Sequence, residues 1–463
     1  MKTEKQLMSL KMSASKKSVC VIGAGPCGMS ALYHFGNTDG GKDVDVVCYE
    51  KQSTWGGLWN FSWRTGNDEF GELCHNGMYK NLWCNSPKET IEFPDYTYED
   101  HFGKAIPSYP PRPVLRDYLE GRWTKSSKAD LSKYIKFNTV VRNVNYDKKA
   151  DTFTVTATNL KTNKSTTETF THVIVAVGIF NCPNVPYFPG IESFEGRILH
   201  SHNLRDATEF KGQRLLVVGA SYSAEDVALM CMKYGAKSAI CTWRTKAMGF
   251  KWPEGIEERE LVQRFEGKTA YFKDGSSAEV DCVILGTGYL YSFSFMEDEL
   301  RLQSSLSMYP DNLYKGTLWL GGGGNKLFYM GIQDQYYSYT IYDAQGLWAC
   351  KYILGQIPNE PKSMHEMKVS VKEWRGKCSK LKSVHDDIDF QTECPPDWCK
   401  DTGYPTDATK AGRLLHEWEH HKVENIVTYR DQCFTSVFTG TKSPKHSVPW
   451  WKAFDDSIDA FVK

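Results

Sequence analysis

Short runs of apolar, mostly β-branched residues alternate along the chain with stretches of helical periodicity. The apolar runs are SVCVIGAG at 18–25, DVDVVCYE at 43–50, THVIVAVG at 171–178, QRLLVVGA at 213–220, SAICTWR at 238–244 and DCVILGTGY at 281–289. The first and the fourth lead directly into a segment of helical periodicity. Because strands that alternate with crossover helices form parallel sheets, the pattern predicts an α/β fold.

A different periodicity, typical of antiparallel strands, occurs between residues 152 and 175. TFTVTATNL and STTETFTHVIV alternate polar and apolar residues and flank the turn LKTNK. Farther on, CPNVPYFPGIESF holds three prolines and a glycine, which predicts an extended connector. Beyond it, KLFYMGI predicts a buried strand, and residues 338–354 predict a helix that ends at Gly355.

These breaks predict a smaller domain inserted into a larger one. The larger domain is expected to comprise residues 18–181 and 306–463, the latter with a C-terminal extension, and the smaller one residues 182–305. Residues 1–17 are polar with interspersed lysines, so they predict a disordered leader and no signal peptide. At 463 residues the chain is long enough to form two cores.

The composition excludes several classes of partner. Lys plus Arg and Asp plus Glu both total 56, so there is no basic excess to favour nucleic acid. No run approaches the length that spans a bilayer, which predicts a cytoplasmic protein without a membrane partner. The 14 cysteines are spread over a large chain, which is typical of buried thiols. Cys394 and Cys399 lack a second pair at zinc spacing, so no metal is predicted.

The first glycine-rich loop has the features of a dinucleotide site. Gly23, Gly25 and Gly28 follow an apolar strand and open a helix near Pro26. Such glycines make the tight turn, admit a pyrophosphate to the backbone and let helix and strand pack closely. Glu50 ends the next strand, where a carboxylate accepts from the ribose hydroxyls and repels a 2′-phosphate. The loop therefore predicts FAD or NAD.

Two adjacent glycines follow at once, in KQSTWGGLWNFSW. Gly56 and Gly57 lie between Trp55 and Trp59, so the backbone can approach a planar group that the aromatic rings line. The alternative is a tight turn beneath a tryptophan-rich core.

The second loop has the same place after its strand but a different composition. Gly219 is followed by Ser221 and Ala224 where the first loop has glycines, and alanine is common at the last place. Its next strand ends in Arg244 and Thr245, and a guanidinium pairs bidentately with phosphate. This loop predicts NADP, although an arginine at a strand end is often a plain surface residue. Together the two loops predict two Rossmann-like domains, one that holds FAD and one that receives NADPH.

Nine motifs occur in a fixed order between residues 18 and 451. They are GAGPCGM, EKQSTWGGLWN, LWCNSPKETIEFPDYTY, SYPPR, FEGRILHSH, GASYSAED, WRTKAMGFKWP, ILGTGY and QDQYYSY. In this the chain resembles the flavin-containing monooxygenases, and within them the bacterial trimethylamine monooxygenase type. The family signature FxGxxxHxxx(Y/F) is present as Phe194, Gly196 and His200, with Leu204 at its last place, which is expected to loosen one contact near the linker. Tyr336 stands where relatives have tryptophan, which bears on the width of the substrate channel.

The resemblance implies an activity. NADPH reduces FAD, O2 adds at the flavin C4a carbon, and the resulting hydroperoxide oxygenates a nitrogen or sulfur nucleophile. The protein excludes water and stray protons meanwhile. The expected substrates are small tertiary amines such as trimethylamine, which gives trimethylamine N-oxide, together with sulfides and indole. The alternative is a Baeyer-Villiger enzyme that acts on ketones. The resemblance also implies a homodimer.

The resemblance further implies site residues. Asn85 matches the family asparagine beside the flavin C4a edge, where an amide donates and accepts without titrating; on local sequence alone it is a turn residue before Ser86 and Pro87. Tyr222 matches a position that contacts NADP and faces the substrate, and we expect Asn85 and Tyr222 to be catalytic. The expected cofactor-binding residues are Gly23, Gly25, Cys27, Gly28, Glu50, Gln52, Gly57, Leu58, Trp59, His75, Asn85, Val141, Gly219, Ser221, Tyr222, Ser223, Arg244, Thr245 and Gln335.

Two other functions have partial support from motifs in the sequence. His416 and His420 fit H-E-x-x-H of the zinc proteases, but no third ligand is evident and the segment is equally an amphipathic helix. A flavin-dependent disulfide reductase needs a redox cysteine pair, and Cys74 and Cys84 have the wrong spacing. An aromatic pocket in this chain, which has 14 Trp and 25 Tyr, would attract an amine through its ring faces.

Overall fold

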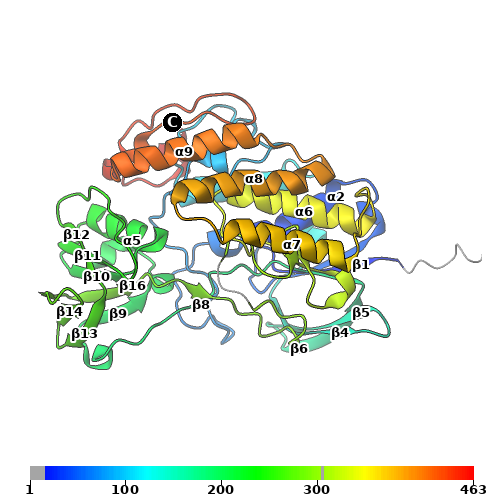
Figure 1. Cartoon of the computed structure of the whole chain (residues 1–463), viewed down its shortest axis with the longest axis horizontal. Helices are drawn as coiled ribbons and strands as arrows, with labels where there is room; N and C mark the ends of the chain where they lie inside the picture. The colour runs from blue at the N-terminus through cyan, green and yellow to red at the C-terminus, as the bar shows by residue number, and fades with distance from the viewer. Residues whose placement is uncertain (1–15, 304–306) are drawn as a thin grey trace, which may run out of the picture.

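The computed structural model describes residues 16–303 and 307–463 and is built around two separate sheets of parallel strands (Figure 1). Of the predicted leader, residues 1–15 lie outside the described residues. The larger sheet consists, in spatial order, of β18 (Leu313–Tyr314), β19 (Leu318–Trp319), β20 (Leu327–Tyr329), β7 (His172–Val175), β1 (Ser18–Ile22), β2 (Asp45–Tyr49) and β3 (Ile135–Lys136). From β20 to β3 all neighbours run parallel, as the apolar runs predict.

The larger sheet is buried on both faces, because successive side chains of a strand point to opposite sides. On β1, Val19 and Val21 join the core cluster formed with the helices, whereas Cys20 and Ile22 join a second cluster. Helices α2 (Pro26–Asn37) and α6 (Ser338–Leu354) pack against each other within the first cluster. The predicted end of α6 at Gly355 is confirmed, and that residue has the left-handed conformation favoured by glycine, with φ of 75°.

An antiparallel sheet contributes the second cluster. It consists of β4 (Thr139–Asp147), β5 (Thr152–Asn159) and β6 (Lys164–Phe170). The pairing of β5 with β6 confirms the period-two prediction. β4 is not evident from the sequence, because a register shift between Val141 and Asn143 interrupts its alternation.

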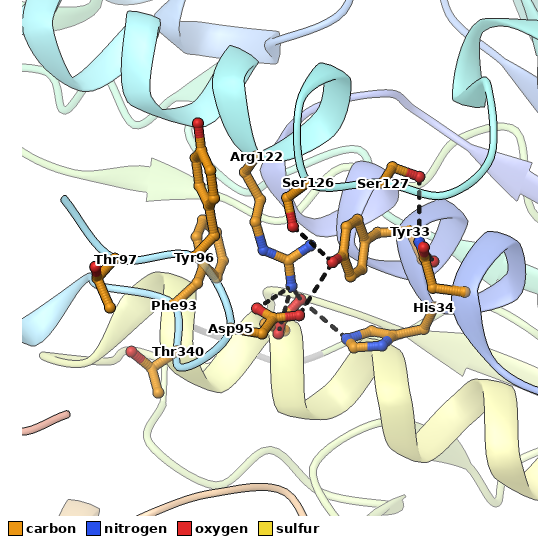
Figure 2. Close-up of polar contacts among 12 residues, drawn as sticks. Tyr33, His34, Phe93, Asp95, Tyr96, Thr97, Arg122, Ser126, Ser127 and Thr340 are labelled. Atoms are coloured by element: carbon orange, nitrogen blue, oxygen red, sulfur yellow. Dashed lines mark hydrogen bonds and ion pairs between the residues drawn. The ribbon is translucent and has the colours of Figure 1, made fainter. Parts of the chain in front are cut away.

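A buried arginine joins the helices behind the first glycine loop. Figure 2 shows Arg122, of α4 (Arg112–Thr124), against Tyr33 of α2. The guanidinium carbon lies 3.3 Å from the centroid of the Tyr33 ring. The guanidinium also lies 3.2 Å from the carboxylate of Asp343 on α6, and His34 of α2 lies 3.0 Å from that same carboxylate. Because buried charges are stable only when paired, this network fixes α2 and α6 to each other.

Three long helices follow α6 and lie side by side (Figure 1). They are α7 (Met364–Cys378), α8 (Val384–Thr402) and α9 (Ala408–Glu424); the short helices α3 (Tyr98–Phe102) and α10 (Ile458–Val462) complete the larger part. Ser363 and Ser383 form capping boxes at the starts of α7 and α8, and Asp407 caps α9. Within residues 16–303 and 307–463, no helix has the length and apolarity needed to cross a bilayer.

The smaller sheet contains five parallel strands. In spatial order they are β12 (Ile256–Glu260), β11 (Ser238–Trp243), β10 (Arg214–Val218), β16 (Cys282–Leu285) and β9 (Arg197–His200). Helix α5 (Tyr222–Lys233) follows β10. An antiparallel sheet of β13 (Val262–Glu266), β14 (Thr269–Phe272) and β15 (Ser277–Glu279) lies beside the smaller sheet. The predicted α/β class with two strand-loop-helix units is confirmed.

The two crossings between the sheets pair with each other. β8 (Cys182–Pro183) and β17 (Tyr289–Leu290) form an antiparallel ribbon, and His200 Nε2 lies 3.0 Å from the carbonyl oxygen of Gly288. Directly after β17, Phe293 and Met296 enter the second core cluster of the larger sheet. The chain therefore packs against the larger sheet again at Phe293 and Met296. Leu204, the departure from the family signature, is buried near this crossing.

Candidate active site

The first glycine loop connects β1 to α2. Gly23 adopts φ of +100°, and its N–H donates to the Tyr49 carbonyl oxygen at 2.9 Å. A Cβ placed on Gly28 would lie 1.9 Å from the Gly23 carbonyl oxygen. Gly28 therefore lets the first turn of α2 contact the strand turn itself, which is the packing role the sequence predicts for it.

The middle glycine of this loop, Gly25, differs from Gly28, because the described residues leave space for a Cβ there. Gly25 caps α2 with φ of −73°, which any residue can adopt, and a Cβ on it would meet Gly57 Cα at 3.6 Å, an ordinary contact. Across the gap, Gly56 donates its N–H to the Ala24 carbonyl oxygen at 2.9 Å. The space beside Gly25 thus faces the N-terminus of α2, where backbone N–H groups and the helix dipole favour an anion.

Glu50 is buried and already holds the loop. Its carboxylate accepts from the N–H of Ala24 at 2.6 Å and from the N–H of Gln52 at 2.7 Å. Burial raises its pKa, and these two hydrogen bonds oppose the rise. Each carboxylate oxygen keeps a lone pair for a further donor. Glu50 therefore links the ends of β1 and β2 and can still accept from a ribose hydroxyl; the sequence analysis predicts only the second role.

Several other predicted residues lie around this loop. Gln52 donates from Nε2 to the Gly57 carbonyl oxygen at 3.3 Å, which orders the short 3-10 turn Gly57–Trp59 that carries Leu58. The ring of Trp59 packs edge-on against Tyr339 at a centroid distance of 6.1 Å. Cys27 is buried in the first turn of α2.

Three further residues predicted to bind a cofactor lie in three different settings. His75 Nε2 lies 2.6 Å from the Val177 carbonyl oxygen, and burial lowers the pKa of His75 to about 4, so the ring is neutral and donates. Gln335 Oε1 is buried with no hydrogen-bond partner in residues 16–303 and 307–463, which leaves an acceptor for a ligand. Val141 is buried in the second core cluster on β4, a position from which its side chain contributes to packing.

The second loop repeats the backbone geometry of the first. Gly219 adopts φ of +144°, its N–H donates to the Thr242 carbonyl oxygen at 3.0 Å, and a Cβ on it would meet the Gly286 carbonyl oxygen at 2.3 Å. Ser221 and Ser223 are exposed at the N-terminus of α5. Arg244 and Thr245 are exposed at the end of β11. The loop thus presents hydroxyls, free helix N–H groups and a cation at one edge of the smaller sheet.

Three aromatic rings from distant parts of the chain meet beside this loop. The ring centroid of Tyr222, at the start of α5, lies 6.1 Å from that of Tyr336 and 6.3 Å from that of Trp418 on α9; Tyr336 and Trp418 are 5.7 Å apart. Burial raises the pKa of Tyr222 and raises that of Tyr336 to about 12, so both phenols are neutral at physiological pH. The three rings of the cluster are therefore uncharged, although the ammonium of Lys422 lies against two of them.

Trp418 also brings Asn85 to the cluster. Its indole N–H donates to the Asn85 carbonyl oxygen at 3.0 Å, and the Asn85 side chain is half-buried. The two residues expected to be catalytic, Asn85 and Tyr222, therefore both contact Trp418. Asn85 precedes the segment that forms the smaller sheet, whereas Tyr222 lies within that segment. Trp418 could not be recognised as a site residue from the sequence, because it lies inside HEWEHH, a segment that indicates only a metal motif or an amphipathic helix.

That motif has another arrangement in the structure. His416 Nε2 lies 2.8 Å from the Asp389 carboxylate, and Nδ1 lies 3.0 Å from His385 Nδ1. Among residues 16–303 and 307–463, no group of three His, Cys, Asp or Glu side chains is placed to hold a metal ion. The contribution of this helix to the site is Trp418, together with Lys422, whose ammonium lies 4.3 Å from the Tyr222 ring centroid.

Comparisons with known proteins agree with this geometry. A family model described as Flavin-binding monooxygenase-like matches residues 16–250 and 254–394. The trimethylamine monooxygenase of Methylocella silvestris is 50% identical over 446 residues, which cover 96% of this chain and 97% of that protein. The trimethylamine monooxygenase of Pelagibacter ubique is 47% identical over 449 residues, 96% and 99% of the two chains. The crystal structure of Tmm from Pelagibacter sp. strain HTCC7211 is similar with a TM-score of 0.92 and 44% identity, and the match covers 96% of this chain and 100% of that one.

Proposed function

Because the chain belongs to the flavin-binding monooxygenase-like family, we propose that it is an NADPH- and O2-dependent enzyme that oxygenates the nitrogen of small tertiary amines. The leading reaction converts trimethylamine to trimethylamine N-oxide. One oxygen atom of O2 goes to the nitrogen, the other leaves as water, and NADPH supplies two electrons. The observation that carries the proposal is the meeting of Asn85, Tyr222 and Tyr336 around Trp418, beside the second loop.

FAD and NADPH, the cofactors expected from the two loops, agree with the family. We assign FAD to the first loop, where the open space at Gly25 fits a pyrophosphate and Glu50 fits an unphosphorylated ribose. The unpaired acceptor of Gln335 fits a donor of the bound group. The flavin supplies the oxygen chemistry, and the C4a-hydroperoxyflavin expected from the resemblance is part of this proposal. The chain supplies binding, orientation and a water-poor surface of aromatic rings.

We assign NADPH to the second loop. The backbone N–H groups of α5 and the hydroxyls of Ser221 and Ser223 face a diphosphate, and Arg244 pairs with the 2′-phosphate. Asn85 would lie where the two cofactors meet, and its amide would hold the nicotinamide and the flavin edge by hydrogen bonds. The homodimer and the remaining predicted contacts are part of the same proposal and rest on the family resemblance.

The aromatic cluster gives the site its preference for amines. The rings of Tyr222, Tyr336 and Trp418 offer an apolar wall to the methyl groups of a small neutral amine, and the ammonium of Lys422 beside them opposes binding of the amine as a charged ammonium ion. The amine must arrive with a free lone pair in order to be oxygenated. Dialkyl sulfides, which are neutral and of similar size, fit the same surface as second substrates.

Arg244→Ala is expected to lower kcat/KM for NADPH about 10- to 100-fold, because a guanidinium-phosphate pair is lost. NADH has no 2′-phosphate, so its kcat/KM stays unchanged and the preference for NADPH falls. Lys237→Ala is the matched control, since Lys237 is an exposed cation at the opposite end of β11. The measurement is steady-state kcat/KM with each nucleotide. Equal decreases in kcat/KM for NADPH and NADH would show that Arg244 does not contact the 2′-phosphate.

The proposed function is tested by following NADPH oxidation and product formation with three substrates. Trimethylamine, dimethyl sulfide and cyclohexanone represent the amine, sulfide and ketone classes, and products are identified by mass spectrometry. We expect trimethylamine N-oxide to form in step with NADPH consumption, and sulfoxide to form more slowly. Lactone as the only product would reject the proposal in favour of the Baeyer-Villiger alternative.

A further inference from the structure

Helix α5 carries three buried ionisable residues. Glu225, Asp226 and Lys233 are between 2% and 6% exposed. A charge buried on a helix is stable only if a partner of opposite charge or a hydrogen-bonding group reaches it. α5 begins at Tyr222 and carries the phosphate-binding N-terminus of the second loop. Whatever pairs with these three residues therefore also sets the position of the NADPH site.

All three residues have partners in one late stretch of the chain, residues 418–453, which we term the C-terminal strap. Lys422 Nζ lies 2.7 Å from the Glu225 carboxylate, and Arg430 pairs with Asp226. Lys233 donates to the Ala453 carbonyl oxygen at 2.6 Å. The strap thus holds a helix that belongs to the smaller sheet, although the chain entered the larger part again long before.

The strap also holds the backbone at Asn85. Trp418 donates to the Asn85 carbonyl oxygen at 3.0 Å, and Arg430 Nε donates to the Cys84 carbonyl oxygen at 3.1 Å. The strap is itself anchored just beyond this point, where the N–H of Phe434 donates to Ser108 Oγ at 3.0 Å. One end of the strap is therefore fixed to the flavin side of the site.

Arg430 joins both attachments through a single group. Its side chain is fully buried; Nε reaches the Cys84 carbonyl and Nη2 reaches the Asp226 carboxylate, while Trp450 lies 4.4 Å from the guanidinium carbon. The guanidinium is planar and rigid, so its two contacts lie at a fixed separation. A lysine at this place has one compact ammonium and cannot make both contacts with that geometry.

We propose that Arg430 is a positioning residue, which sets the separation between Asn85 and helix α5 and hence between the flavin and the nicotinamide that the two loops hold. This inference rests on the proposed function. The competing explanation is that Arg430 and Asp226 only stabilise the fold, as any buried ion pair whose partner is lost destabilises a protein.

Two mild variants separate these explanations. Asp226→Asn keeps the size and an acceptor but removes the charge, and Arg430→Lys keeps the charge but removes the planar fork. The readouts are the rate of flavin reduction by NADPH, the fraction of NADPH that yields N-oxide and not hydrogen peroxide, and the unfolding temperature. We expect reduction to slow about 10- to 100-fold in Arg430→Lys, since a displacement of about 1 Å has effects of that size. We expect the N-oxide yield to fall below about half, and Asp226→Asn to show the same changes in weaker form.

Lys315→Met is the matched control. The Lys315 ammonium lies 2.9 Å from both Asp397 and Asp401 of α8, its side chain is 9% exposed, and its partners lie away from α5 and Asn85. It should lose stability as Arg430→Lys does and keep its flavin reduction rate and product yield. Wild-type reduction and yield in both Arg430→Lys and Asp226→Asn would overturn the inference, and so would equal losses in Lys315→Met. If the wild-type protein makes no N-oxide from trimethylamine, the proposed function fails, while the reduction rate still tests the role of Arg430.

Discussion

Replacing Asn85 with alanine is expected to leave a folded, yellow protein whose rate of N-oxide formation falls at least about 100-fold, the usual effect of removing one aligned hydrogen-bond donor from an active site. The fold should survive because the contact that fixes this residue uses its backbone carbonyl, which accepts from Trp418 at 3.0 Å and is present in any variant. The neighbouring Cys84 is held in the same way through its carbonyl by Arg430. Only the amide is lost, and that amide is the group we assign to the nicotinamide and the flavin edge.

The measurement compares N-oxide formation, flavin content and unfolding temperature across three variants. Asn85→Asp keeps the shape but loses the donor and adds a charge, so it should be as inactive as Asn85→Ala. Ser86→Ala, next in the chain and equally half-buried, should retain activity. Turnover in Asn85→Ala within a fewfold of wild type would show that the amide has no direct role. Loss of flavin from this variant would show that Asn85 acts by holding the cofactor.

Local units of the fold could be predicted because each is complete within a short stretch of sequence. Gly23 to Glu50 contains the strand, the turn, the helix start and the acid, and the structure places Glu50 against the loop at Ala24. Arg244 likewise ends the strand that follows Gly219. In both cases the glycines and the charged residue lie within one strand-loop-helix-strand unit, which is short enough to be recognised as a pattern.

The contacts that complete the site could not be predicted, because they join residues far apart in the sequence. Trp418 and Asn85 are 333 residues apart, and Arg430 and Cys84 are 346 apart. One partner in each contact is a backbone carbonyl, which leaves no trace in side-chain chemistry. Glu225 and Asp226 likewise resemble ordinary helix carboxylates in the sequence, because Lys422 and Arg430, which pair with them, lie far along the chain in the strap.

The second loop shows which glycines of the first loop serve packing and which serve the ligand. Ala224 occupies the place equivalent to Gly28 and is fully buried, so that loop is built around a methyl group. Ser221 occupies the place equivalent to Gly25 and is exposed, so a side chain there meets no protein atoms that exclude it. In the first loop a Cβ has space at Gly25 but not at Gly28. An alanine substitution at each position therefore separates the role in ligand binding from the role in packing.

Gly28→Ala is expected to prevent formation of the flavin domain. The new Cβ would lie 1.9 Å from the Gly23 carbonyl oxygen and 2.9 Å from the carbonyl carbon, and both are backbone atoms that cannot rotate away. α2 would have to move off β1, although its residues from Cys27 to Gly36 are buried. We expect a loss of more than about 3 kcal/mol of folding free energy, the upper range for overpacking a core, and recovery of little or no yellow protein.

Gly25→Ala adds the same methyl group three residues earlier and is expected to fold. Its Cβ would meet Gly57 Cα at 3.6 Å, and the backbone at Gly25 has φ of −73°, so neither sterics nor strain opposes it. The methyl group occupies the space through which a pyrophosphate approaches the backbone, so flavin affinity should fall about 100-fold while the unfolding temperature of the flavin-free protein stays unchanged. The flavin-to-protein absorbance ratio and thermal unfolding of both variants test the pair. A Gly28→Ala protein with full flavin would show that α2 can move, whereas a Gly25→Ala protein with wild-type affinity would place the pyrophosphate away from this loop.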